Sequence, residues 1–284
     1  MKIGIAGYRG FIGEAVIQHF TDAEFILIDR QEVYRRDETL KNRLEDVDVI
    51  MNFAGSPVLK RWNKKNRRSI ETSRVKFTNC LIDIVNALNK KPHMLINVSA
   101  IGIYEYGNYH DELHFTEGKG YLPALVRDWE GTLEHIDRSV EMVIVRLGLV
   151  CGNSGGALPT LTRMTKLGLG AVIGSGKQVY SFIHIKDVCG AIRYIVKERK
   201  KGIFNLTAPE PVTNKKFVRE LGKSMNRPVF LRIPAFIFRL LYGEAADILI
   251  KGHTVIPQRL INEGYPFKFK NIEQVFRDLM REKQ

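Results

Sequence analysis

Cysteine is scarce in this 284-residue chain, which contains only Cys80, Cys151 and Cys189. The three lie far apart and match neither a paired disulfide framework nor the short spacings of a zinc site. Their distribution excludes a disulfide-stabilised secreted scaffold and gives no reason to expect a bound metal. We therefore expect the protein to work in a reducing cytoplasm.

Long hydrophobic runs are also missing. The N-terminal segment MKIGIAG has one lysine and an apolar stretch shorter than the core of a secretory signal. The most apolar stretch near the C-terminus, residues 233–242, contains Arg239 and is much shorter than the roughly 20 residues that cross a bilayer. We expect neither a secretory leader nor a membrane partner.

Positive charge is in excess, because 44 Lys and Arg against 31 Asp and Glu give a net charge of +13. The densest basic cluster surrounds Trp62 and comprises Lys60, Arg61, Lys64, Lys65, Arg67 and Arg68. Such a cluster could grip the phosphates of a nucleic acid. A charged run at the start of a helix is more often a solvated surface, however. We favour the solvated surface and expect no nucleic-acid partner.

Short apolar runs alternate with amphipathic segments through the first half of the chain. Strands are predicted at residues 2–6, 25–28, 47–53, 93–98 and 141–147, and helices at residues 11–20, 66–89 and 121–138. The longest helix carries one apolar face, formed by Ile70, Phe77, Leu81, Ile84 and Leu88. This alternation predicts an α/β fold with a doubly wound parallel sheet, covered by helices on both faces.

The pattern changes after residue 150, where glycines and prolines interrupt shorter elements. We expect residues 1–150 to form a dinucleotide-binding Rossmann domain. Residues 151–284 should form mainly a smaller C-terminal α/β lobe, which holds the substrate, and a tail domain. Strands near residues 179–183 and 202–206 are predicted to return to the first domain.

A glycine-rich loop follows the first predicted strand and precedes the first predicted helix. It consists of Gly7, Tyr8, Arg9, Gly10, Phe11, Ile12 and Gly13. In a dinucleotide-binding loop, the first glycine allows a tight turn and the second lets the backbone approach the pyrophosphate. The third glycine lets the helix pack on the strand. This loop, with Asp29 ending the next strand, predicts a nicotinamide dinucleotide cofactor.

The choice between NADP and NAD depends on three side chains. Asp29 could accept hydrogen bonds from the adenosine ribose, which favours NAD, whereas Arg30 and Arg9 could pair with a 2′-phosphate, which favours NADP. Asp29 and Arg30 can face the ribose together only if the strand has already ended. Because two arginines favour NADP and only one carboxylate favours NAD, we expect NADP, with NAD as the alternative.

Further motifs follow the glycine loop in order. They are Asn52-Phe53-Ala54-Gly55, Ser73-Arg74-Val75, Ser99-Ala100-Ile101-Gly102-Ile103-Tyr104, Gly155-Gly156-Ala157-Leu158-Pro159 and Ser181-Phe182-Ile183-His184-Ile185-Lys186-Asp187-Val188. Together they resemble the extended short-chain dehydrogenase/reductase superfamily, and more narrowly its atypical subgroup of epimerase family proteins. The resemblance covers nearly the whole chain. It implies a Rossmann domain, a nicotinamide cofactor that also contacts Phe53, Ala54, Gly55 and Ser99, and a C-terminal substrate lobe.

The catalytic residues of that superfamily are not all present. In its active members a tyrosine acts as general acid/base, and a lysine four residues later lowers the tyrosine's pKa. Tyr121 begins the expected helix, but its fourth neighbour is Leu125. The usual catalytic Ser or Thr is replaced by Ala100, with Ser99 beside it. Tyr121 and Ser99 are therefore the catalytic candidates, and Arg127 is a candidate for the missing cation.

Four other polar residues have expected roles. We expect His184 to be a structural hydrogen bonder that closes the lobe, and Asp187 to cap the helix that it starts. Glu130 should pair with an arginine, and Arg146 is either a ligand contact or part of an ion pair. Residues 154–156 are predicted to form a mobile loop at the carboxyl end of the sheet, where ligands bind in such folds.

Two functions remain open from the sequence. The first is an NADP-dependent oxidoreductase or epimerase-like enzyme acting on a small polar substrate, such as a sugar nucleotide. The second is a dinucleotide-binding sensor or structural protein with little or no turnover. The glycine loop supports both, whereas the missing lysine favours the second. The sequence leaves the substrate and the oligomeric state open.

Overall fold

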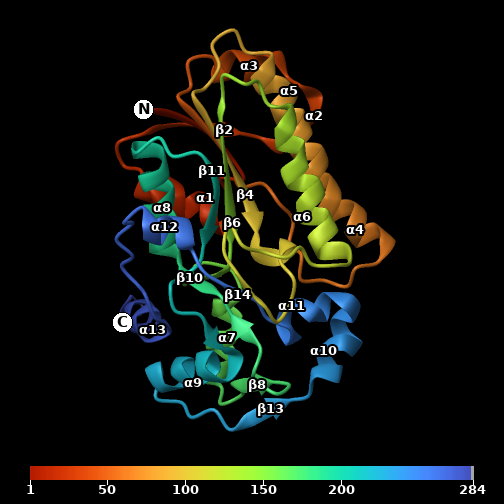
Figure 1. Ribbon diagram of the computed structural model, residues 1–284, viewed down its shortest axis with the longest axis vertical. Helices are drawn as coiled ribbons and strands as arrows, with labels where there is room; N and C mark the ends of the chain where they lie inside the picture. The colour runs from red at the N-terminus through yellow and green to blue at the C-terminus, as the bar shows by residue number, and fades with distance from the viewer. Residues whose placement is uncertain (283–284) are drawn as a thin grey trace.

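The computed structural model describes residues 1–282 and contains a six-stranded parallel sheet (Figure 1). The strand order is β2-β1-β3-β4-β6-β11. These strands are β1 (Lys2–Ala6), β2 (Glu24–Ile28), β3 (Val49–Asn52), β4 (Met94–Ala100), β6 (Glu141–Leu147) and β11 (Gly202–Leu206). The sheet grows in opposite directions from β1, so the order reverses between β1 and β3, where ligands bind in doubly wound folds. The predicted fold class is confirmed.

Helices cover both faces of this sheet. One face packs on α1 (Phe11–His19) and α8 (Ile185–Lys197), and the other packs on α2 (Arg30–Arg35), α3 (Glu38–Leu44) and α5 (Phe77–Asn86). Side chains alternate between the two cores: Ile96 and Val98 lie on the side of α1 and α8, whereas Leu95 lies on the side of α5. Burial on both faces explains why the strands are almost continuously apolar.

The long helix predicted at residues 66–89 contains a π-helical turn. It begins as α4 (Lys64–Glu71), continues as the π-helical segment η1 (Thr72–Lys76) and ends as α5. Beside it runs α6 (Tyr121–Gly131), which is followed by the single 3₁₀ turn η3 (Thr132–His135) and is therefore shorter than predicted (Figure 1). Single π turns occur frequently at functional sites.

The smaller C-terminal lobe lies below the sheet in Figure 1 and is built from two-stranded sheets and short helices. The strand pairs are β7 (Leu149–Cys151) with β10 (Phe182–His184), β9 (Val179–Tyr180) with β12 (Val212–Thr213), β8 (Ala171–Ile173) with β13 (Leu231–Ile233), and β5 (Tyr109–His110) with β14 (Thr254–Val255). The helices are α7 (Leu158–Lys166), α9 (Asn214–Ser224), α10 (Ala235–Tyr242), α11 (Asp247–Ile250), α12 (Gln258–Asn262) and α13 (Ile272–Arg281), with the 3₁₀ turn η4 (Gly243–Ala246). Another 3₁₀ turn, η2 (Ile101–Ile103), directly follows β4 of the main sheet. Phe182, Phe217 and Phe276 form the centre of its core.

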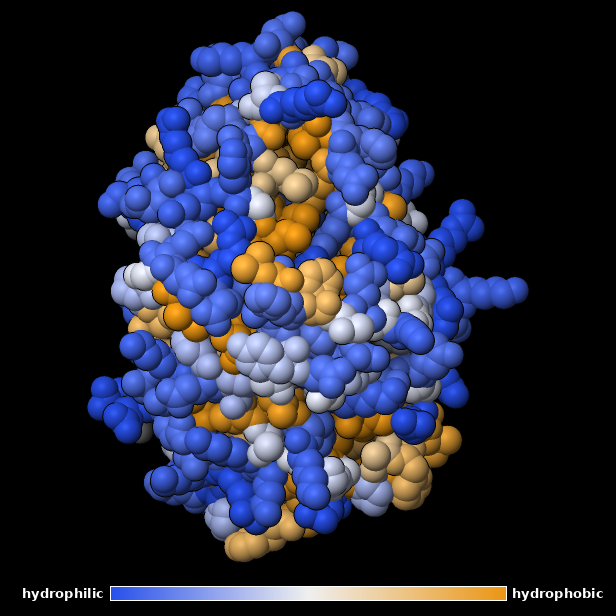
Figure 2. Space-filling model, viewed as in Figure 1, coloured by the Kyte–Doolittle hydropathy of each residue, from blue (hydrophilic) through white to orange (hydrophobic). Residues whose placement is uncertain are grey.

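The surface is mostly hydrophilic on the face shown in Figure 2, with a hydrophobic patch at the lower right, where α10 lies in Figure 1. Phe236, Leu240 and Leu241 of α10 are exposed. None of the helices within residues 1–282 combines the length and the apolar composition that a membrane crossing requires.

Candidate functional site

The glycine loop joins β1 to α1 and has the geometry that a dinucleotide requires. Gly7 adopts a φ of 76°, a left-handed conformation that glycine allows. A Cβ atom on Gly7 would lie 2.6 Å from the carbonyl carbon of Phe53, so the loop closely approaches the end of β3. A Cβ on Gly13 would collide with the carbonyl oxygen of Gly7, which explains why the helix can pack so closely on the strand.

Gly10 faces open space at the start of α1. Its backbone N–H donates to the carbonyl oxygen of Gly7 at 2.9 Å. Among the residues that the structure describes, a Cβ on Gly10 would approach only that same oxygen, at 3.2 Å. Within the described chain no side chain caps α1, a helix of nine residues, so its first N–H groups are available to a ligand. Such a helix terminus favours a phosphate.

Phe11 connects the glycine loop to the C-terminal lobe. A Cβ on Gly152 would lie 2.5 Å from the tip of the Phe11 ring, and a Cβ on Gly155 would lie 2.5 Å from the Cβ of Phe11. The loop that includes residues 154–156 therefore packs directly on the start of α1. Only glycine leaves room for this contact, and it places the second lobe beside the predicted pyrophosphate site.

The side chains that were expected to choose the cofactor lie just beyond β2. The strand ends at Ile28, so Asp29 and Arg30 are not restricted to opposite faces. Asp29 is the N-cap of α2: its carboxylate accepts from the N–H of Gln31 at 2.8 Å, and Glu32 accepts from the N–H of Asp29 in return. Arg30 and Arg9 are both exposed. The cap occupies the carboxylate, whereas both guanidinium groups remain accessible.

The residues Phe53, Ala54 and Gly55 follow β3 and are held by buried amides. The Asn52 side chain accepts from the N–H of Ala54 at 3.1 Å and donates to Asn97 at 2.7 Å. It also donates to Thr78, which accepts from the indole N–H of Trp129 at 2.9 Å. This network joins the ends of β3 and β4 to α5 and α6, and fixes the loop beside the glycine turn.

Ser99 belongs to a second buried network at the end of β4. Its hydroxyl donates to Glu130 at 2.5 Å. Glu130 also accepts from Arg146 at 2.9 Å and 2.7 Å, which confirms the predicted pairing with an arginine. Arg146 in turn donates to the hydroxyl of Tyr104, which donates to Asn205 at 2.7 Å. Ser99 is therefore a buried member of this hydrogen-bond network, and its hydroxyl is already engaged by Glu130.

Tyr121 lies against α4 and not beside Arg127. Its ring is 4.9 Å from that of Trp62, and the guanidinium carbon of Arg67 lies 4.5 Å from its centroid. Arg127 instead forms an exposed ion pair with Glu117, so the suggestion that Arg127 replaces the missing lysine is wrong. Burial, with a contribution from the carboxylate of Glu71, raises the pKa of Tyr121 to about 12. The phenol stays protonated at neutral pH.

The basic cluster around Trp62 is only partly a solvated surface. Arg61, Lys64, Lys65 and Arg68 are exposed, as expected. Arg67, however, pairs with Glu244 of the C-terminal lobe at 2.7 Å. This ion pair connects α4 to the segment that follows α10, and the two lie near each other in Figure 1.

Arg74 belongs to the Ser73-Arg74-Val75 motif of the family resemblance, but no site role was predicted for it. It lies in η1, half-buried, and donates to the carbonyl oxygen of Ser56 at 2.9 Å. A signal was present, because Arg74 follows Ile70 by four residues and precedes Phe77 by three, and so interrupts the apolar face of the helix. A charged residue on an apolar face points to a specific partner.

His184 and Asp187 form structural hydrogen bonds at the start of α8. The side chain of His184 accepts from the N–H of Lys186 at 3.0 Å and caps α8, which confirms a structural role. Burial lowers its pKa to about 4, so the ring is neutral. The prediction that Asp187 caps this helix is wrong. Its carboxylate instead accepts from the N–H groups of Lys268 and Phe269, both at 2.9 Å, and anchors the segment before α13.

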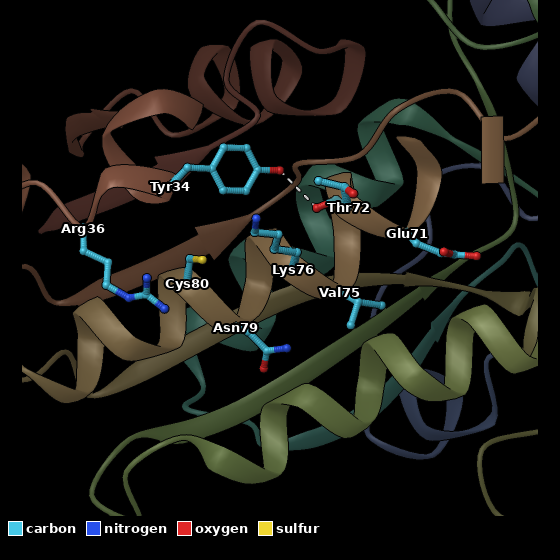
Figure 3. Close-up of a pocket in the computed structure, with 8 residues that line it drawn as sticks. All are labelled: Tyr34, Arg36, Glu71, Thr72, Val75, Lys76, Asn79 and Cys80. Atoms are coloured by element: carbon cyan, nitrogen blue, oxygen red, sulfur yellow. Dashed lines mark hydrogen bonds between the residues drawn. The ribbon is translucent and has the colours of Figure 1, made fainter. Parts of the chain in front are cut away.

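A surface groove of about 460 Å³ lies between α2 and the η1–α5 helix (Figure 3). It is lined by Tyr34, Arg36, Glu71, Thr72, Val75, Lys76, Asn79 and Cys80. The Tyr34 hydroxyl crosses it to donate to the carbonyl oxygen of Thr72 at 3.0 Å. None of its lining residues belongs to the predicted cofactor site, so the groove is a separate feature.

Two protein-family models match the chain. The NAD dependent epimerase/dehydratase family matches residues 3–207, which include the glycine loop and all of the parallel sheet except its first residue. A domain of unknown function (DUF1731) matches residues 233–279, which include α10 to α12 and most of α13.

Relatives of similar length occur in distant organisms. The chain is 31% identical to epimerase family protein SDR39U1 of Mus musculus, over 99% of this chain and 100% of the relative. It is 29% identical to a chloroplastic homologue of SDR39U1 from Arabidopsis thaliana, over 99% of this chain and 87% of the relative. The predicted resemblance to epimerase family proteins is confirmed.

The fold also matches a solved relative. The crystal structure of human epimerase family protein SDR39U1 with NADPH has a TM-score of 0.91 and 27% identity, and the match covers 99% of both chains. At the level of the family, the prediction of an NAD(P)-binding, epimerase/dehydratase-like protein is confirmed, and the NADPH of the human structure agrees with the predicted NADP.

Proposed function

The chain belongs to the NAD dependent epimerase/dehydratase family, and from that membership we propose that it binds NADPH on the loop from Gly7 to Gly13 and acts on a small polar substrate. The observation that carries the proposal is the open space over Gly10, beside the uncapped start of α1. A pyrophosphate fits there, because the backbone N–H groups meet it without a side chain in the way. When bound, NADPH supplies the hydride for reducing a carbonyl group.

The preference for NADPH over NADH rests on the residues after β2. Asp29 is engaged in capping α2, and its carboxylate is therefore less available to the ribose hydroxyls. Arg30 and Arg9 are exposed and can form charge-assisted hydrogen bonds to a 2′-phosphate. We assign the 2′-phosphate to these two arginines.

The substrate binds, in this proposal, at the carboxyl edge of the sheet between Tyr121 and the C-terminal lobe. The packing of Gly152 and Gly155 on Phe11 supports this, because it positions the lobe over the cofactor site. A sugar nucleotide is the substrate class that we propose to test first. We further place the protein in a reducing cytoplasm, where Cys80, Cys151 and Cys189 remain free thiols.

A second function is favoured by the surroundings of the two catalytic candidates. Tyr121 has a pKa of about 12 and no lysine four residues later, and the Ser99 hydroxyl is bound to Glu130. Both features weaken ordinary proton transfer by these residues. The alternative is a dinucleotide-binding sensor or structural protein with little turnover.

Fluorescence titration of the protein with NADPH and NADH tests the proposal. We expect NADPH to bind at least tenfold more tightly. A screen of sugar nucleotides and small carbonyl compounds for oxidation of NADPH then separates an enzyme from a sensor. Failure of both reduced cofactors to bind the folded protein would refute the assignment of the glycine loop.

A further inference from the structure

Arg74 is a half-buried cation for which the described chain provides no counter-ion. Its hydrogen bonds within residues 1–282 go to the carbonyl oxygen of Ser56, at 2.9 Å, and to the hydroxyl of Ser73, at 3.5 Å. Its guanidinium also lies 5.2 Å from the centroid of the Trp129 ring. No carboxylate within these residues pairs with it. By contrast, the other buried arginine at this edge, Arg146, is held by Glu130.

This arrangement leaves most of the hydrogen-bonding capacity of Arg74 unused. A guanidinium has five N–H donors in a planar fork, and both partners of Arg74 are reached through Nη1 alone. Burying a cation without an opposite charge is unfavourable. Burial accordingly lowers the pKa of Arg74 to about 10. The charged form is therefore destabilised, but the group is still charged at neutral pH.

The guanidinium lies against the loop that follows β3. A Cβ on Gly55 would lie 3.1 Å from Nη2, 3.2 Å from Cζ and 3.5 Å from Nη1 of Arg74, so glycine leaves room beside the group. Gly55 is exposed and follows β3, next to the turn that contains Gly7. Trp129, whose ring centroid lies 5.2 Å from the guanidinium carbon, belongs to α6, which begins with Tyr121. Arg74 therefore lies between the cofactor loop and the candidate catalytic helix.

Arg74 lies within the π-helical turn η1. Figure 3 shows Glu71, Thr72, Val75 and Lys76, which flank Arg74 in sequence, extending from this helix in different directions. A π turn holds one residue more than an α turn, and such turns are frequent at functional sites. The π turn, the missing counter-ion and the glycine against the guanidinium are three separate observations at one place.

We infer that Arg74 binds an oxyanion, a carboxylate or a phosphate, at the carboxyl edge of the sheet. The inference deepens the proposed function and rests on it, because the oxyanion is carried either by NADPH or by the substrate. A guanidinium fork matches the geometry of both groups and holds them through two parallel hydrogen bonds.

The variant Arg74→Gln tests this inference, because glutamine keeps the first part of the side chain and a polar amide but has neither the charge nor the guanidinium fork. The control is Arg68→Gln, which removes the same charge from an exposed position of α4. For each protein, two quantities are measured: the dissociation constant of NADPH, and the rise in melting temperature caused by inorganic phosphate, with and without saturating NADPH.

Two outcomes support the inference and identify the source of the oxyanion. If NADPH carries it, Arg74→Gln weakens NADPH binding at least tenfold, whereas Arg68→Gln does not. If the substrate carries it, NADPH binding changes less than threefold, and stabilisation by phosphate at saturating NADPH is lost in Arg74→Gln alone. Arg74→Gln that matches the wild type in both measurements overturns the inference.

Two further comparisons keep the test decisive. If Arg74→Gln does not fold, Arg74→Lys takes its place: loss of the fork should weaken the same binding several-fold, and unchanged binding overturns the inference. If the wild type binds no NADPH, the proposed function fails. The phosphate measurement without NADPH still decides whether Arg74 binds an oxyanion.

Discussion

The hydroxyl of Ser99 donates to the same carboxylate of Glu130 that Arg146 holds through two nitrogens. This contact joins the end of β4 to α6 and β6 through a buried ion pair. It also gives the serine a partner that a substrate would have to replace. Any effect of changing Ser99 therefore combines a change in this network with a change in the chemistry.

The ion pair should contribute strongly to stability. Glu130→Gln leaves the buried Arg146 without its counter-charge, and we expect the free energy of unfolding to fall by about 3–5 kcal/mol. The exposed pair Arg127–Glu117 offers a control, because Glu117→Gln should cost less than about 1 kcal/mol. Urea denaturation measures both. Equal effects of the two substitutions would mean that the buried pair has no special role.

Gly10→Val should abolish dinucleotide binding and leave the fold intact. The backbone of Gly10 has a φ of −89°, which valine can adopt, and the added side chain would occupy the space over α1. We expect the affinity for NADPH to fall by more than tenfold, which is about 1.4 kcal/mol or more. Gly131→Ala is the control, because a Cβ there meets nothing within 4 Å. Unchanged affinity in folded Gly10→Val would disprove the phosphate-loop assignment.

Arg30→Ala should reduce the preference for NADPH over NADH. The loss of a charge-assisted contact to the 2′-phosphate should cost about 1.5–3 kcal/mol, roughly tenfold or more in NADPH affinity. NADH binding should barely change. Arg35→Ala, at an exposed position in the last turn of the same short helix, controls for general charge. If titration calorimetry shows that the wild type binds NADH more tightly than NADPH, Asp29 and not Arg30 contacts the adenosine ribose.

If the substrate screen finds an activity, Tyr121→Phe should retain part of it. The pKa of Tyr121 is about 12, so the phenol cannot act as a base near pH 7. We expect the pH–rate profile to be the same in the variant and the wild type below about pH 10. Ser99→Ala should cost more, because it alters the contact with Glu130. Complete loss in Tyr121→Phe, with Ser99→Ala fully active, would show that Arg67 or Arg74 activates the tyrosine.

Stability should decrease on acidification because of buried neutral histidines. Burial lowers the pKa of His184 to about 4 from 6.5, so between these values the unfolded chain binds a proton that the folded protein does not. The stability associated with His184 is thus present above about pH 6.5 and is lost progressively as the pH falls toward 4. His253, with a pKa also lowered to about 4 by burial, adds a similar effect.

Replacing His184 alone isolates its contribution to the pH dependence of stability. His184→Asn keeps a side chain that can cap α8 and removes the titrating group. The slope of unfolding free energy against pH, measured by urea denaturation from pH 7 to pH 4.5, should be shallower in the variant. An identical slope in the two proteins would contradict a depressed pKa for His184.

The sequence predicted the features that depend on neighbouring residues. The glycine spacing and the apolar runs predict the turn and the strands of the main sheet, including the return of residues 202–206 as β11. The strand expected near residues 179–183 does not return to that sheet: it forms β9 and β10, which pair with β12 and β7 in the C-terminal lobe. The capping role of Asp29 was also visible in principle, since Asp29 and Glu32 have the spacing of a capping box. It was missed because the same aspartate matched the expected ribose-binding position.

The features that depend on distant residues could not be predicted. Ser99, Glu130 and Arg146 come from three different elements, and only the folded sheet brings them together. The partner of Asp187 likewise lies some eighty residues away, so the helix cap that its position suggested was replaced by a longer-range contact. Tertiary packing outweighs local preference at such sites.

The π turn between Glu71 and Phe77 also fixes the rotational phase of the long helix. An α-helix advances by about 100° per residue, and the wider π turn absorbs one additional residue, so α5 keeps the phase that it would have in a regular helix one residue shorter. Deleting a single residue of the turn would leave Ile70 and Phe77 in phase but would remove the wide turn that holds Arg74. Over evolutionary time this segment should therefore accept substitutions far more readily than changes of length, because the placement of Arg74 depends on how many residues precede it.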